Sequence, residues 1–175
     1  DAAKDLQAGA YALSKIAPVH VSYNGRLSSS VFQNLGNVTL HKVSGPHPAG
    51  NVGVQISHID PIHKGEVVWT ISPIHLAALG HVVNTGKLEL SRKIAVTGPA
   101  APFTGYVSAL PGTPVKEIAA PEAGIRVIGG DALTGSILGD EGYTGFFDSQ
   151  LTFLREGYDR EWFGWAKPIR PKVYS

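Results

Sequence analysis

The stretch "EVVWTISPIHLAALGHVVNTGKLELSRKIAVTG" (residues 66–98) contains the clearest helix pattern of the chain, with an apolar run on each side. Ser72 can cap this helix, Pro73 suits its first position because no N–H is needed there, and Gly86 suits its end. The run before the helix, residues 66–71, and the run that closes the quoted stretch are rich in β-branched residues and predict buried strands. Strand, helix and strand in this order predict a βαβ unit.

The same alternation extends toward the N-terminus. The predicted elements there are a helix at 3–16, a strand at 19–23, a short helix at 27–36, a strand at 37–43 and a helix from Pro48 to before Pro61. Such an order is typical of a parallel sheet. The side chains expected to face the core from the first helix and from the clearest helix are Leu6, Ala10, Leu13 and Ile16, and Ile74, Leu79 and Val82 or Val83.

The pattern changes after Gly98. Short strand-like segments at 104–118, 124–135 and 149–157 are separated by glycine and proline turns. The sequence therefore predicts two domains, an α/β segment at 1–98 and a β-rich module at 99–175. The second ends in an aromatic segment that contains Trp162, Phe163 and Trp165.

Composition limits the function classes. The chain has 175 residues, of which 43% are hydrophobic and 17% charged, with a net charge of +1 and no cysteine. The charged fraction is below the roughly 25% of an average soluble chain, which indicates that a partner covers part of the surface. The missing cysteines exclude thiolate metal sites, iron–sulfur clusters and disulfides. Without a basic run, nucleic acid is not an expected partner, and we find no membrane-spanning run.

The histidines of "SGPHPAGNVGVQISHIDPIHKGEVVW" (residues 44–69) raise the question of a metal site. His58 and His63 are five positions apart, and Pro61 between them interrupts any helix that would align them. His47 lies eleven positions before His58. Because zinc needs three or four converging ligands, we predict no metal site here. A stand-alone metal-dependent enzyme that uses these three histidines stays as an alternative.

The same stretch could hold an anion. Its candidate residues are Ser44, Gly45, His47 and Gly50, where a strand turns into a predicted helix and free N–H groups would point at a ligand. The spacing matches neither the dinucleotide motif nor the P-loop. We favour an ordinary turn, in which Gly45 or Gly50 has a conformation that a Cβ would strain and His47 bonds a neighbouring carbonyl or carboxylate. A nucleotide-binding module remains the alternative. No catalytic residue stands out.

Three motifs carry a resemblance to a known family. "SGPHPAGNVG" (44–53), "GDALTGSILGDEGYTGFFDSQLTFLREG" (130–157) and "EWFGWAKP" (161–168) resemble the A subunit of the bacterial sodium-translocating NADH:quinone oxidoreductase. The resemblance covers essentially the whole chain, in order. The C subunit of Rnf-type complexes and the flavoprotein subunit of respiratory complex I are more distantly similar, and the former is a further alternative identity.

The resemblance implies a fold and a function. The family's protein is longer, and the chain has no methionine, so we expect a fragment that lacks N- and C-terminal parts. The expected fold is an incomplete Rossmann-like βαβ layer followed by a β-grasp-like, soluble-ligand-binding module. The whole complex oxidises NADH, reduces ubiquinone and exports sodium, with flavins and iron–sulfur held by other subunits. This chain is then expected to be non-catalytic, to bind no cofactor, and to contact other subunits peripherally on the cytoplasmic side of the inner membrane.

Overall fold

The computed structural model describes residues 2–26, 30–139, 141–157, 162, 163 and 166. The chain divides into two compact units, Asp1–Glu89 and Leu90–Ser175. This division lies before residue 98, where the sequence pattern changes. The strand predicted at 93–98 therefore belongs to the second unit, because its hydrogen-bonded neighbours all lie there. The aromatic segment near the C-terminus lies largely outside the described residues.

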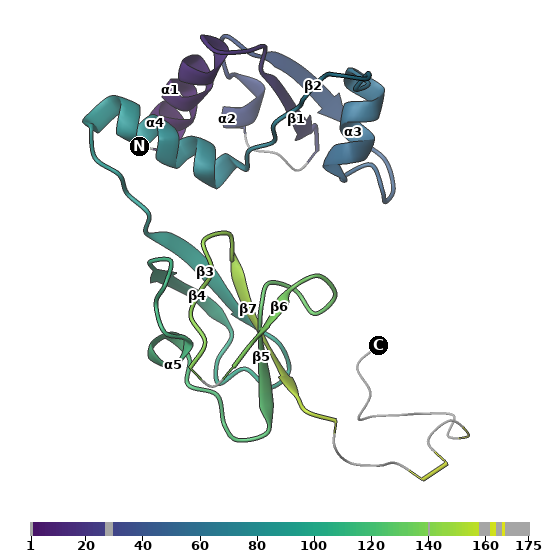
Figure 1. Ribbon diagram of the computed structural model, residues 1–175, viewed down its shortest axis with the longest axis vertical. Coiled ribbons are helices and arrows are strands. Elements are labelled where there is room, and N and C mark those ends of the chain that lie inside the picture. Colours follow the sequence, from purple (N-terminus) through teal and green to yellow (C-terminus); the bar gives the residue numbers. More distant parts are fainter. Residues whose placement is uncertain (1, 27–29, 140, 158–161, 164–165, 167–175) are drawn as a thin grey trace. The chain divides into compact units, whose positions relative to one another are not determined.

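The first unit contains helices and a small parallel sheet (Figure 1). Its elements are α1 (Ala2–Ser14), β1 (His20–Asn24), α2 (Ser30–Gln33), β2 (Thr39–Val43), α3 (Val52–Ile59) and α4 (Pro73–Thr85). Strands β1 and β2 pair in parallel, with His20 opposite Thr39 and Asn24 opposite Val43. The parallel pairing and the α/β class are confirmed, and the predicted alternation of strands and helices holds from β1 to α3. The βαβ unit predicted at 66–98 is not found, because residues 66–71 form no strand and β3 pairs with strands of the second unit.

The core of this unit lies where α1 crosses α4. Leu6, Ala10, Leu35 and Leu76 are buried together. The two helix backbones approach closely because glycines stand at the crossing. A Cβ added at Gly80 would overlap the backbone of Asp5, and one added at Gly9 would overlap the carbonyl oxygen of Leu76.

Helix α4 begins and ends as predicted. Ser72 is the N-cap and its hydroxyl accepts from the backbone N–H of His75, while Gly86 closes the helix with a left-handed φ of 70°. The buried face differs from the prediction, however. Leu76 and Gly80 are buried, whereas Ile74 is half exposed. The predicted stripe of α1 is confirmed for Leu6 and Ala10, which are buried, but not for Ile16, which lies beyond the helix end and is exposed.

The strand predicted at 66–71 does not form. These residues connect α3 to α4 without helix or strand structure (Figure 1). All of them are exposed. Trp69 is 91% exposed and Val67 76%. The prediction is wrong because β-branched composition indicates a fit to a sheet and does not itself provide the neighbouring strand.

The second unit is a mixed five-stranded sheet in the order β4-β3-β7-β5-β6. Its elements are β3 (Arg92–Thr97), β4 (Gly105–Ala109), α5 (Val115–Ile118), β5 (Ile125–Gly129), β6 (Ser136–Leu138) and β7 (Gln150–Arg155). Strand β3 pairs with β7 in parallel, and the other pairs are antiparallel. Ile94, Val96, Leu151 and Phe153 are fully buried at its centre. Among the described residues of both units, no helix has the length and apolar character needed to cross a bilayer.

A first prediction concerns the helix crossing. We expect Gly80→Ala to lower the free energy of unfolding by about 3 kcal/mol, because the new methyl group must push α1 away. Gly53→Ala is the matched control, since Gly53 also lies in a helix but has open space around its Cβ position. It should stabilise by about 0.5–1 kcal/mol. Thermal and urea unfolding measure both, and equal effects would contradict the close-crossing explanation.

A second prediction concerns pH. The Asn84 amide, which donates to Asp5 at 2.8 Å, lowers the pKa of the Asp5 carboxyl. Burial of the carboxyl raises this pKa, and the hydrogen bond with His81, at 3.3 Å, lowers it. A lowered folded pKa gives stability that is present above the unfolded pKa and lost as pH falls through the folded one. We expect Asp5→Asn to destabilise the chain at pH 6, and the difference from wild type to vanish in acid. A difference that is constant with pH in urea titrations would refute this linkage.

Candidate functional site

The candidate site lies at the carboxyl ends of β1 and β2. Because the strands are parallel and in register, their last residues and the loops that follow meet at one edge. Ligands in open α/β sheets bind at this edge. A small cavity of about 140 Å³ opens there. Its lining residues are Ser22, Tyr23, Asn24, Val43, Ser44, Gly45, Ala49, Gly50 and Gln55.

Three of the four predicted site residues line this cavity, namely Ser44, Gly45 and Gly50. His47 is not among the lining residues, although it lies in the same turn. No Lys, Arg, Asp or Glu of the described residues lines the cavity, so its polarity comes from hydroxyl, amide and backbone groups. Such a lining can hold a small neutral or weakly charged group, but it provides no strong attraction for phosphate.

The turn between β2 and α3 is held by its own backbone. The N–H of Ala49 donates to the carbonyl of Pro46 at 3.0 Å, and that of Asn51 donates to Pro48 at 2.8 Å. The Gln55 side chain then donates to the carbonyl of Ala49 at 3.0 Å. These bonds tie the turn to the first turns of α3. The stretch therefore has the internal bonding of an ordinary chain reversal.

The two glycines of the turn differ. Gly45 has a φ of 149°, and a Cβ there would meet the Cβ of Ala49 at 3.2 Å. Gly50 has no positive φ and no atom within 4 Å of its Cβ position. Strain at Gly45 is thus as predicted, whereas strain at Gly50 is not found. The glycine spacing in the sequence could not distinguish these two backbone conformations.

Helix α3 begins at Val52 rather than at Pro48. Asn51 is its N-cap but makes no side-chain capping bond. The first N–H groups of a helix have no partner within the helix.

Within the part of the chain that the structure describes, His58 and His63 each bond locally rather than converging on a common point. His58 Nδ1 lies 2.8 Å from the carbonyl oxygen of Val54, within its own helix. The backbone N–H of His63 donates to Glu66 at 2.7 Å. For the His47 ring, no hydrogen bond is found among the described residues, so the predicted bond to a carbonyl or carboxylate is absent there. The described part of the chain holds no group of three His, Cys, Asp or Glu arranged for a metal ion.

Sequence reasoning missed a histidine pair on the sheet. His20 Nδ1 and His41 Nε2 are 2.9 Å apart, and the two rings stack at 5.1 Å between centroids. His41 is opposite Ser22 in the parallel register. Both histidines fall in segments predicted as strands, so an assumed register could have brought them together. The pair is exposed or half exposed and has no third ligand among the residues that the structure describes, so it is assigned no function.

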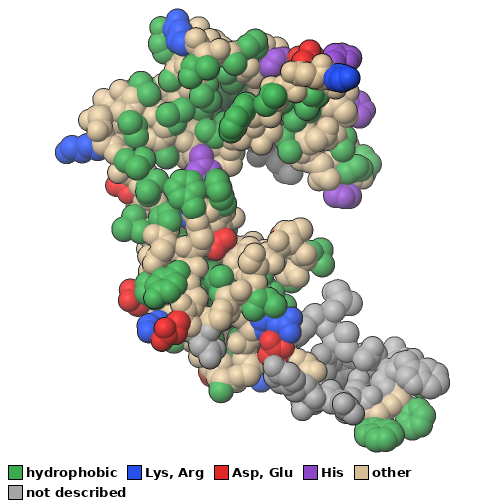
Figure 2. Space-filling model, in the orientation of Figure 1, with side chains coloured by type: hydrophobic (Ala, Val, Ile, Leu, Met, Phe, Trp, Pro, Cys, Tyr) green, Lys and Arg blue, Asp and Glu red, His purple; other side chains and the backbone are tan. Residues whose placement is uncertain are grey.

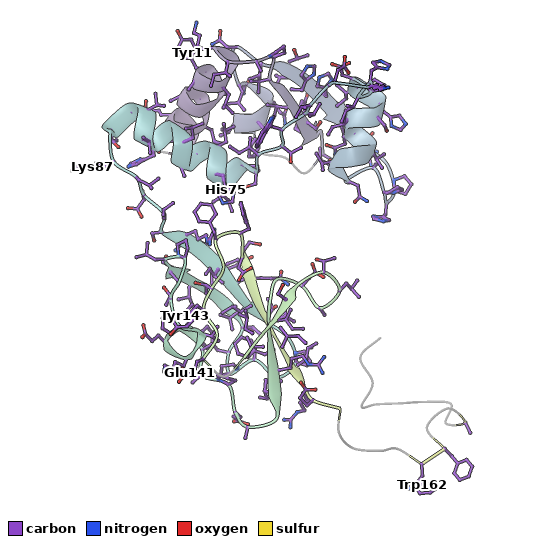
Figure 3. The ribbon with its side chains drawn as sticks, viewed as in Figure 1. Tyr11, His75, Lys87, Glu141, Tyr143 and Trp162 are labelled. Carbon is purple, nitrogen blue, oxygen red and sulfur yellow. The ribbon has the colours of Figure 1, made fainter. Side chains whose placement is uncertain are left out.

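A larger depression, about 800 Å³, lies beside α1 and is lined in part by Tyr11. Figure 3 labels Tyr11 in the first unit. The depression is wide and open. Polar side chains on its wall bond within the protein: Gln7 exchanges two hydrogen bonds with the backbone of Gly36, at 3.1 and 2.8 Å, and Asp5 accepts from Asn84. The depression is therefore an open surface between packed elements, and it lacks the enclosed shape of a binding site.

The comparisons with known proteins all match one protein family. A family model described as the NqrA second alpha/beta domain matches residues 1–88. The A subunit of the Na(+)-translocating NADH-quinone reductase of Neisseria meningitidis serogroup A is 33% identical over 180 residues, which cover the whole of this chain and 40% of that protein. The corresponding proteins of Vibrio vulnificus and Serratia proteamaculans are 35% and 37% identical over 78% and 77% of this chain. The chain spans about two fifths or less of the length of these relatives.

A third prediction separates a turn from an anion site. We expect Gly45→Ala to destabilise by roughly 1–2 kcal/mol, because the left-handed backbone favours glycine. Gly50→Ala, the matched control in the same turn, should change stability by less than about 0.5 kcal/mol. Phosphate should stabilise wild type no more than an equal ionic strength of chloride. Saturable stabilisation by phosphate that is lost in His47→Ala would show instead that the turn is an anion site.

Proposed function

This chain belongs to the NqrA family, and on that premise we propose that it is a non-catalytic docking part of NqrA in a Na(+)-translocating NADH-quinone reductase. It contributes surface and scaffold, while oxidation of NADH and reduction of ubiquinone take place in the assembled complex. The family match over the first unit and the identity over the whole chain support this proposal.

The observation that carries the docking role is the apolar surface. Large hydrophobic side chains are exposed on both units, and charged residues make up only 17% of the chain. Figure 2 shows hydrophobic side chains across the face in view of each unit, with charged ones few and scattered between them. Trp69 in the first unit and Tyr106 and Phe147 in the second are each more than three quarters exposed. Aromatic residues at this exposure are typical of surfaces that a partner covers.

The proposal includes a place for the chain. We propose that it contacts other subunits of the complex and lies peripherally on the cytoplasmic side of the inner membrane. NAD and ubiquinone are then substrates of the complex, and this chain holds no cofactor. We propose that contact with quinone uses the same apolar surface, because a quinone ring and its isoprenoid tail are themselves apolar.

A fourth prediction tests this role. The purified chain should not oxidise NADH, and it should be retained by solubilised reductase from which NqrA has been removed. Replacing Tyr106 and Phe147 by Ser should weaken retention at least about tenfold if the second unit docks through its aromatic residues. The matched control replaces two exposed lysines, Lys93 and Lys116, by Ser and should leave retention unchanged.

Two results would contradict the proposal. One is NADH oxidation by the chain alone, which would make it an enzyme in its own right. The other is loss of retention in the lysine control but not in the aromatic variant, because binding would then depend on charge and not on the apolar surface.

A further inference from the structure

The segment Glu66–Ile71 occupies the place of a strand in the order of elements. In the first unit, β1 is followed by α2, β2 by α3, and this segment lies between α3 and α4. A strand after a helix crossover runs parallel to the strands before it. The sheet of the described residues has only two strands here, β1 and β2. Parallel sheets are normally covered on both faces and larger than this, so a two-stranded one is incomplete.

The side chains of the segment have the composition of a buried strand but lie in solvent. In an extended chain, alternate residues point to opposite faces, which would place Val67, Trp69 and Ile71 on one face. All three are exposed, to 76%, 91% and 47%. Val68, on the opposite face, is also exposed. One face of the segment is therefore fully apolar, while Val68 shares the other with Glu66 and Thr70, which is typical of a strand with one covered face.

The backbone of the segment is unpaired as well. Among the backbone hydrogen bonds of the described residues, none reaches the N–H or carbonyl groups of 67–71. Helix α3, which leads into the segment, has no buried residue. The core of the first unit is built from α1, α4, α2 and the two strands, without α3 or the segment. Residues 60–71, which include the segment, thus form a continuous stretch in which every residue is exposed.

We infer that Glu66–Ile71 is a β-strand that pairs with an apolar strand from another part of the same NqrA protein. The inference rests on the proposed role as a part of NqrA. The match covers 40% of the Neisseria meningitidis relative, so 60% of that protein lies outside it and can supply the strand. The matching family model is described as the second alpha/beta domain, which places further chain in the family's protein. Pairing would give the segment a neighbouring strand and bury Trp69.

The test compares hydrogen exchange in two proteins. The first is the 175-residue chain. The second is a full-length hybrid, the Neisseria meningitidis relative in which the matched stretch is replaced by residues 1–175. We expect the amides of 67–71 to exchange at nearly unprotected rates in the chain and about 100-fold or more slowly in the full-length hybrid. The amides of β1 and β2 should be protected in both proteins, which shows that both are folded.

Proline variants of the full-length hybrid make the test specific to strand pairing. Val68→Pro and Thr70→Pro each remove an N–H from the segment and should abolish the protection of its neighbours. Ile62→Pro is the matched control, because Ile62 is half exposed in the preceding loop and outside the proposed strand. It should leave the protection unchanged.

Three outcomes would overturn the inference. The segment could exchange equally fast in the full-length hybrid and in the chain. Protection in the isolated chain that rises with protein concentration would identify a second copy as the occupant. Protection that develops only when the other subunits are added would identify one of them. Retention of the full-length hybrid by the stripped reductase is measured separately, so failure of the strand and failure of the docking role are distinguished.

Discussion

The first unit depends on a single close contact between two helices. Gly9 in α1 and Gly80 in α4 allow the helix backbones to meet, and a side chain at either position would separate them. This closeness brings Leu6 and Ala10 against Leu76 and excludes water from the small core. Gln7, from the same helix, bonds the loop before β2 through Gly36. Without the crossing, α1 would lose its position over the sheet, and β1 and β2 would lose much of their cover.

The parts of the fold that sequence predicted best are those set by local chemistry. Ser72 and Gly86 define α4 because a capping hydroxyl and a left-handed glycine act within one helical turn. The predicted buried face of α4 was wrong for a different reason. Apolar size favoured Ile74, but the neighbouring helix approaches where there is least side chain, at Gly80. The buried face of α4 is thus determined by the helix that packs against it. The sequence pattern of α4 alone does not predict that face.

The candidate site was predicted in part for the same reason. The order of strand, turn and helix brings Ser44, Gly45 and Gly50 to the carboxyl edge of the sheet, where they line one cavity. The conformation of each glycine depends on the bonds between residues 46 and 51, which the spacing does not reveal. The pairing of His20 with His41 depends on strand register, a tertiary property. The sequence therefore predicts where the turn lies, but not the backbone conformations and hydrogen bonds within it.

The two units differ in how completely they bury their apolar residues, and this difference explains the wrongly predicted strand. In the second unit, the described strands form one five-stranded sheet, in which Ile94 of β3 and Phe153 of β7 are fully buried. The strand-like segments there pair with one another within the same unit, Leu90–Ser175. In the first unit equally strand-like residues at 66–71 have no neighbouring strand among the described residues, although the order of elements leaves a place for one. Burying Trp69 and its neighbours would stabilise by about 25 cal/mol for each Å² of apolar surface, a gain that only an additional strand or covering surface can provide. The exposed strand sequence is thus evidence about what surrounds the chain in its assembled state.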